Sequence, residues 1–116
     1  MHRRVDEKDA QDSQGKKTNP SSGTVLADTD SVAHKPGTYE VFVLVGATVA
    51  CWVQLEHRNS ANDAHVDDPI GIRVPADAPA QFLWGYFLQS TERVRVTVES
   101  TITGDVWASV RIQRVG

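Results

Sequence analysis

The segment from His57 to Asp68 holds the densest group of side chains able to do chemistry. It combines two imidazoles with three carboxylates, from His57, His65, Asp63, Asp67 and Asp68. Such a set has ligand atoms for Zn²⁺ or Ca²⁺. However, the spacing matches neither the HExxH zinc motif nor an EF-hand calcium loop. Because Asn and Asp also favour tight turns, we interpret the segment as a solvent-exposed turn and predict no metal site.

Nucleophilic catalysis has no support in the sequence either. No serine lies in the GxSxG turn that exposes a nucleophile. Cys51 alternates with Val49 and Val53, so we expect a small buried residue rather than a reactive thiolate. No glycine-rich loop precedes a helical pattern, so a phosphate-binding loop is not supported. We therefore predict that the protein is not an enzyme and has no catalytic residues and no cofactor.

Tryptophans are stronger candidates for a binding role. Trp107 occupies the polar face of the last predicted strand, and Trp52 shares a face with Gln54 and Glu56. Exposed tryptophans anchor many protein interfaces, and their amphipathic rings can also stack on sugars, so both interpretations stay open for these two residues. Trp84 lies among apolar neighbours, and we expect it in the core.

From Gly23 onward, apolar and polar residues alternate with the period of two that is typical of β-strands. Seven strands are predicted, at residues 24–33, 39–45, 49–57, 70–74, 81–88, 93–99 and 106–113. The second is apolar on both faces, which predicts a central strand covered on both sides. The sixth presents Arg93 and Arg95 outward, which we interpret as a solvated face. With no helical period, the fold class is all-β, an antiparallel β-sandwich or jelly roll with an extended N-terminal arm.

The arm is residues 1–22, and the β-sandwich domain is residues 23–116. Met1 and Val5 are the only large apolar side chains of the arm. Such a segment cannot bury enough surface to offset the entropy of ordering it. We therefore expect a partner outside this chain to hold the arm.

Charge and composition argue against several classes of protein. The 116 residues carry a net charge of −3, with +1 on the arm and −4 on the rest, so the clustered positive charge of a nucleic-acid-binding protein is missing. No apolar run is long enough to span a membrane, and the N-terminus lacks the apolar stretch of a signal peptide. We expect no nucleic-acid or membrane partner, and synthesis in a cytoplasm without Sec export. The single cysteine excludes an intrachain disulfide.

The domain resembles small jelly-roll virion proteins of tailed bacteriophages, of the type that decorates capsids or belongs to tails and fibres. The resemblance is carried by GTYEVFVLVGATVACWVQLEHRNSAND, IGIRVP and STERVRVTVESTITGDVWASVRIQRV. It is strongest at residues 55–63 and 103–110, it covers Gly23 to Val115, and it leaves the arm unmatched.

This resemblance implies a non-enzymatic structural role, trimeric packing and a terminal extension that grips neighbouring subunits. We therefore expect a capsid decoration or cement protein, located in the virion, made in the host cytoplasm and forming a homo-oligomer, with a trimer favoured. Its partners would be the major capsid protein or other virion proteins. The predicted partner-binding residues are Arg3, Arg4, Lys16, Lys17, Trp52 and Trp107.

The four cations among these residues would pair with an acidic capsid surface, although exposed ion pairs are individually weak. Two alternatives stay open. The first is a tail-fibre, spike or baseplate module that binds a receptor or carbohydrate. The second is a carbohydrate-binding module in which Trp52 or Trp107 stacks on sugar.

Overall fold

The computed structural model of the chain describes residues 10–29 and 35–115. The predicted arm residues Arg3 and Arg4 therefore lie outside the described residues. The described residues form eight strands: β1 (Ala10–Thr18), β2 (Val25–Asp28), β3 (Gly37–Ala47), β4 (Cys51–Asn59), β5 (Ile70–Val74), β6 (Ala80–Leu88), β7 (Glu92–Val98) and β8 (Asp105–Arg114). Within the described ranges, no helix meets the length and apolarity needed to cross a membrane.

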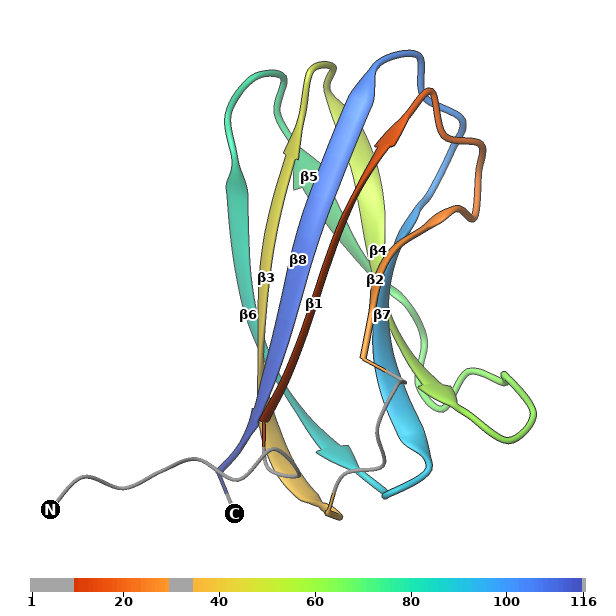
Figure 1. Cartoon of the computed structure of the whole chain (residues 1–116), viewed down its shortest axis with the longest axis vertical. Helices are drawn as coiled ribbons and strands as arrows, with labels where there is room; N and C mark the ends of the chain where they lie inside the picture. Colours follow the sequence, from red (N-terminus) through yellow and green to blue (C-terminus); the bar gives the residue numbers. More distant parts are fainter. Residues whose placement is uncertain (1–9, 30–34, 116) are drawn as a thin grey trace, which may run out of the picture.

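Two four-stranded antiparallel sheets face each other as a β-sandwich (Figure 1). Sheet A has the strand order β1-β8-β3-β6, and sheet B has the order β2-β7-β4-β5. The chain crosses repeatedly from one sheet to the other, because β2, β4, β5 and β7 lie in sheet B and the remaining strands in sheet A. The predicted fold class, an all-β antiparallel sandwich, is confirmed.

The core lies between the sheets and is built from alternate residues of each strand. On β3 the side chains of Tyr39, Val41, Val43 and Val45 are buried, as the period of two predicts. Phe42, on the opposite face, is 40% exposed. The prediction that this strand is covered on both faces is therefore wrong. The strand is central in sheet A, but only the inner face of this sheet packs against sheet B.

Residues 10–18, which composition assigns to the arm, form strand β1 of sheet A. This strand pairs with β8 from Ala10–Gln113 to Thr18–Asp105, and the two strands run side by side in Figure 1. A Cβ on Gly15 would lie closer than 3.0 Å to the carbonyl oxygen of Leu26, so glycine is needed for this approach of β1 to β2. Composition misses the strand because backbone hydrogen bonds, rather than apolar burial, attach it to its neighbour.

Candidate functional site

The outer face of sheet A holds Trp107 flat against the backbone of β3. Trp107 pairs with Gly46, and a Cβ on Gly46 would be closer than 3.0 Å to three atoms of the indole ring. The ring therefore lies directly over the glycine, and the other side of the ring faces outward. Trp107 is 36% exposed. A tryptophan seated in this way is a platform on which a second flat, apolar surface can stack.

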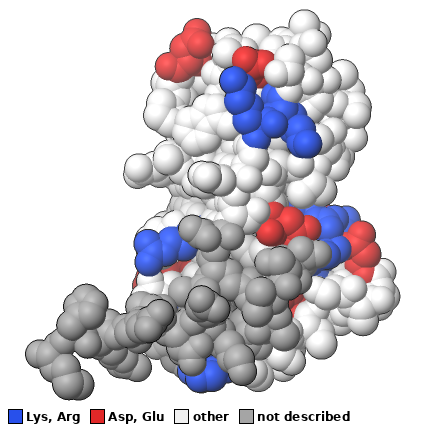
Figure 2. All heavy atoms as spheres, viewed as in Figure 1, with Lys and Arg blue, Asp and Glu red and all other residues white. Residues whose placement is uncertain are grey.

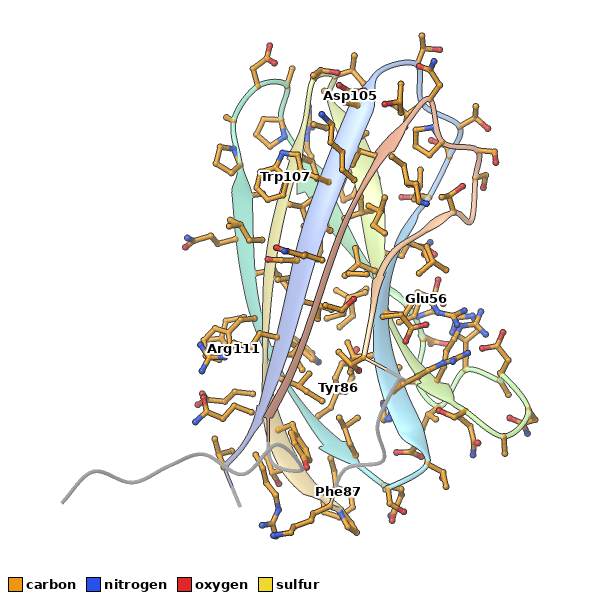
Figure 3. The ribbon with its side chains drawn as sticks, in the orientation of Figure 1. Glu56, Tyr86, Phe87, Asp105, Trp107 and Arg111 are labelled. Atoms are coloured by element: carbon orange, nitrogen blue, oxygen red, sulfur yellow. The ribbon has the colours of Figure 1, made fainter. Side chains whose placement is uncertain are left out.

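Lys16 and Asp105 border the Trp107 ring. Lys16 pairs with Trp107 across β1 and β8, and its Nζ lies 3.6 Å from Oδ2 of Asp105. The Thr18 hydroxyl donates a hydrogen bond of 2.7 Å to Asp105. Figure 3 shows Asp105 and Trp107 at the same end of the sandwich. The fold therefore brings together two of the predicted partner-binding residues, Lys16 and Trp107.

Two adjoining hollows meet at Trp107. The first, of about 330 Å³, lies between Trp107 and the turn at residues 77–79. The second, of about 440 Å³, is lined by Gln14, Leu44 and Ser109 together with Trp107. Because Trp107 forms a wall of both, the two hollows make one continuous shallow groove, which we call the Trp107 groove.

A third hollow continues across sheet A toward β6. It has a volume of about 580 Å³ and is lined by Phe42, Leu83 and Arg111, with Leu44 as a wall shared with the Trp107 groove. None of these residues is among the predicted partner-binding residues. The signal for them in the sequence was the second apolar face of β3, which was predicted to be covered.

Lys17 and Trp52 lie away from the Trp107 groove. Lys17 pairs with Val106, whose side chain points inward, so Lys17 and Lys16 lie on opposite faces of β1. Trp52 is 47% exposed on the outer face of sheet B. Its ring contacts Gly71, where a Cβ would meet it at an ordinary distance of 3.4 Å. The two predicted tryptophans are therefore on opposite sheets and cannot form one site.

The prediction that Trp84 belongs to the core is wrong. Trp84 pairs with Val41 on the inner face of sheet A and stacks on Phe82 with ring centroids 5.7 Å apart. It is nevertheless 46% exposed. Trp84 is exposed because β6 is the last strand of sheet A. The last strand of sheet B on that side, β5, has only five residues and does not cover Trp84.

The segment 57–68 contains the predicted turn. The side-chain oxygens of Asn59 and Asn62 accept hydrogen bonds from the backbone N–H groups of Ala61 and Ala64, at 2.9 and 3.1 Å. Asp63 adopts a φ of 54°, a conformation that Asn and Asp tolerate better than most residues. Over residues 10–29 and 35–115, no group of three or more His, Cys, Asp or Glu side chains is arranged to hold a metal ion.

Asp63 ties this turn to β7. Its Oδ1 lies 2.6 Å from Nη2 of Arg93 and 3.5 Å from Nη2 of Arg95. The hydrogen bond from Arg93, and the positive charges of the neighbouring arginines, lower the pKa of Asp63. Arg95 also pairs with Asp28 of β2 at 3.0 Å. The interpretation of this face of β7 as solvated is therefore wrong, because its arginines link β2, β7 and the turn.

His57 is buried and has a structural role. Its Nδ1 lies 2.7 Å from Asp67 and its Nε2 lies 3.0 Å from Glu92, so both ring nitrogens have partners. The imidazole also packs on Tyr86 with ring centroids 4.7 Å apart. Burial, with a smaller contribution from the charge of Asp67, raises the pKa of Tyr86 to about 12. Burial likewise raises the pKa of the Cys51 thiol, although Cys51 is partly buried and not fully buried as predicted, because it lies at the first position of β4.

Known proteins resemble this chain in fold. No protein-family model and no curated protein matches it. The CBM22-1–GH10 fragment of xylanase 10B from Clostridium thermocellum, solved with xylohexaose, covers 97% of this chain with a TM-score of 0.58 and 17% identity. This chain spans only 27% of that fragment.

Two further structures match over most of their own length. The N-terminal cellulose-binding domain of β-1,4-glucanase C from Cellulomonas fimi has a TM-score of 0.54 and 15% identity, over 89% of this chain and 75% of that domain. The globular domain of zebrafish complement 1qA has a TM-score of 0.60 and 8% identity, over 92% and 97%. Identities this low show a shared jelly-roll sandwich and leave function to the site itself.

Proposed function

We propose that this chain is a non-catalytic carbohydrate-binding β-sandwich. The observation that carries the proposal is the position of Trp107. Its ring lies over Gly46, and the other side of the ring faces outward into the Trp107 groove. The C–H-rich face of a sugar ring is a flat, apolar surface of the kind that stacks on an indole. The fold shared with the cellulose-binding domain from Cellulomonas fimi supports this proposal.

Polar groups beside the ring supply the hydrogen bonds that sugar hydroxyls need. The side chains of Gln14 and Ser109 line the groove and form no hydrogen bond within the described part of the chain. Lys16 and Asp105 face each other at 3.6 Å across an exposed pair, which is a weak interaction that sugar hydroxyls can replace. Bound ligands are typically recognised in this way, by an apolar floor and a few polar groups.

The shape of the groove suits a chain of sugars rather than a single ring. The hollow at residues 77–79 and the hollow at Leu44 adjoin on either side of Trp107. A linear oligosaccharide can therefore stack one ring on Trp107 and place its neighbours in the two hollows. We expect β-linked glucan or xylan fragments to be bound better than free glucose or xylose.

Isothermal titration of the full-length chain with cellohexaose, xylohexaose and laminarihexaose tests this proposal. Trp107→Ala is expected to lose binding by at least about tenfold, which corresponds to about 1.4 kcal/mol. The matched control is Trp52→Ala, which removes an exposed tryptophan from sheet B and is expected to bind like the wild type. Absence of binding to all three sugars, or equal losses in the two variants, would refute the proposal.

A role in a virion is a second proposal, based on the resemblance of residues 23–115 to small jelly-roll virion proteins. Carbohydrate binding would suit a tail-fibre, spike or baseplate module. Capsid decoration was expected to use an arm that includes Lys16 and Lys17, yet both residues belong to β1. Co-sedimentation of the full-length chain with purified phage capsids and purified tails separates the two locations, and binding to neither would count against both.

A further inference from the structure

β6 is an edge strand with unusual chemistry. It pairs with β3 over nine residues, and in the part of the chain that the structure describes no strand pairs with its other side. Its sequence, AQFLWGYFL, has no charged residue and no proline. Leu83 and Phe87 on its outer face are 60% and 57% exposed, and Trp84 is half-exposed on its inner face. An uncharged apolar edge of this kind favours pairing with another chain.

The other three sheet edges carry features that discourage such pairing. β1 presents the exposed cations Lys16 and Lys17. β2 has only four residues and an irregular register between Val25 and Ala27. β5 has five residues and an exposed Arg73. Lysine, short strands and bulges are the usual protections of an edge, and β6 has none of them.

We propose that β6 and the apolar hollow beside it are covered by a second copy of this chain. Leu83, Trp84 and Phe87 together leave on the order of 400 Å² uncovered, about half of the roughly 800 Å² that each partner contributes to a standard interface. Phe42 in the neighbouring hollow and the backbone edge of β6 add to this area. Arg111 on the wall of that hollow provides a charged rim around an apolar centre.

A second copy matches this surface better than a sugar does. A stacked sugar would cover one face of the strand, whereas apolar side chains are exposed on both faces of β6. Another β6 offers the same uncharged strand, and repeating one contact around a symmetry axis gives a closed oligomer. Charges in Figure 2 gather in separate groups with uncharged surface between them. The inference does not rest on carbohydrate binding, because no residue of β6 lines the Trp107 groove.

Size-exclusion chromatography with light scattering on the full-length chain tests the inference, over a range of concentrations up to the solubility limit. The wild type is expected at twice the chain mass of 12.7 kDa, because pairing of β6 with another β6 closes around a two-fold axis. Phe87→Glu and Leu83→Lys each place a charge on the exposed β6 surface and are expected at the mass of one chain. The matched control, Trp52→Glu, changes an exposed aromatic residue on sheet B and is expected to keep the wild-type mass. Circular dichroism confirms that each variant is folded.

Three results would overturn the inference. The first is a wild type with the mass of one chain at every concentration. The second is an oligomer that persists in both β6 variants. The third is an oligomer that Trp52→Glu also dissociates. Glycan titration of the same samples is read separately, so a failure of self-association is distinguishable from a failure of carbohydrate binding.

Discussion

Two exposed tryptophans each lie against a glycine, one on each sheet, but the two contacts differ in how close they are. Gly46 lies under Trp107 and Gly71 lies beside Trp52. A Cβ on Gly46 would come closer than 3.0 Å to the indole, whereas a Cβ on Gly71 would stand at 3.4 Å, an ordinary contact. At the scale of single residues, Trp107 therefore depends on its glycine and Trp52 does not.

Gly46→Ala is expected to displace the Trp107 ring. The overpacking should lower the free energy of unfolding by about 1–3 kcal/mol and weaken oligosaccharide binding together with it. Gly71→Ala is the control and should change the free energy of unfolding by less than about 0.5 kcal/mol. Urea unfolding followed by tryptophan fluorescence, with titration of the same variants, measures both effects. Equal losses of stability and of binding in the two variants would contradict the conclusion that Trp107 depends on the glycine beneath it.

Tyr39 and Tyr86 give a second comparison between single residues. They pair across β3 and β6 and are both buried. The Tyr39 hydroxyl donates a hydrogen bond of 2.6 Å to the carbonyl oxygen of Lys35, whereas the hydroxyl of Tyr86 has no partner among the described residues.

Tyr39→Phe is expected to lower the free energy of unfolding by about 1 kcal/mol, because it removes a hydrogen bond. Tyr86→Phe is expected to leave the free energy of unfolding unchanged or raise it by up to about 1 kcal/mol, because it removes a buried hydroxyl without a partner. Denaturant unfolding at neutral pH measures both variants. A loss for Tyr86→Phe as large as that for Tyr39→Phe would be inconsistent with the structure.

At the scale of elements, β1 makes part of the N-terminal segment a structural strand of sheet A rather than a free arm. Its pairing with β8 covers the edge of a strand that carries Trp107, and it brings Lys16 to the site. The Ser13 hydroxyl also accepts a hydrogen bond of 3.1 Å from the backbone N–H of Asp28, which joins β1 to β2 of the other sheet. Strand β1 therefore closes one side of the sandwich.

Removing residues 1–22 is expected to destabilise the domain as well as remove an arm. We expect the melting temperature to fall by at least about 10 °C, because a strand paired over nine residues is lost and β8 becomes an edge. A chain that begins at Ala10 is the control, since it keeps β1. Thermal unfolding followed by circular dichroism compares the two truncated chains. Equal melting temperatures would indicate that β1 contributes nothing to stability.

The turn at Asp63 is a second element whose attachment can be tested. The lowered pKa of Asp63 means that its contribution to stability is full above pH 3.8, the ordinary pKa, and is lost as the pH falls through the lower pKa of the folded chain. Asp63→Asn should be less stable than the wild type at pH 7, and the difference should disappear in acid. Asp68→Asn, at an exposed carboxylate of the same segment, is the control. Urea unfolding across this pH range measures the effect, and a difference that grows in acid would contradict the assignment.

At the scale of the whole molecule, Trp107 and Phe87, one residue from each proposed surface, lie at opposite ends of sheet A. Trp107 pairs with Gly46 and Phe87 pairs with Thr38, at positions eight residues apart on β3. Eight residues of a strand span about 27 Å. Figure 3 shows the two side chains at the top and bottom of the sandwich.

At this separation the effects of changes at these two residues should be independent. Phe87→Glu is expected to bind each oligosaccharide with the affinity of the wild type, within about twofold, while it reduces the mass to one chain. Trp107→Ala is expected to lose sugar binding while it keeps the wild-type mass. Titration and light scattering on the same two variants test this independence. Loss of sugar binding in Phe87→Glu would mean that the groove is completed by another copy.

The fold was predictable to a greater extent than the site. Val41 and Val43, like the alternating residues of β8, reveal their strands through a period of two that is local in sequence. β1 lacks this signal, because polar residues such as Gln14 and Lys16 lie along it and its partner is far away in the chain. The prediction for Trp84 was wrong for a related reason, since apolar neighbours indicate a core position only in a strand that other elements cover.

The sequence by itself determined that this protein contains an antiparallel β-sandwich, because side-chain alternation depends only on residues next to one another. It also marked Trp107 as an outward-facing residue on its strand. Only the tertiary structure decided that Trp107 lies on Gly46 beside Lys16, and that β6 is an edge. The physical reason is that strand order and register depend on contacts between distant parts of the chain, which no local pattern specifies.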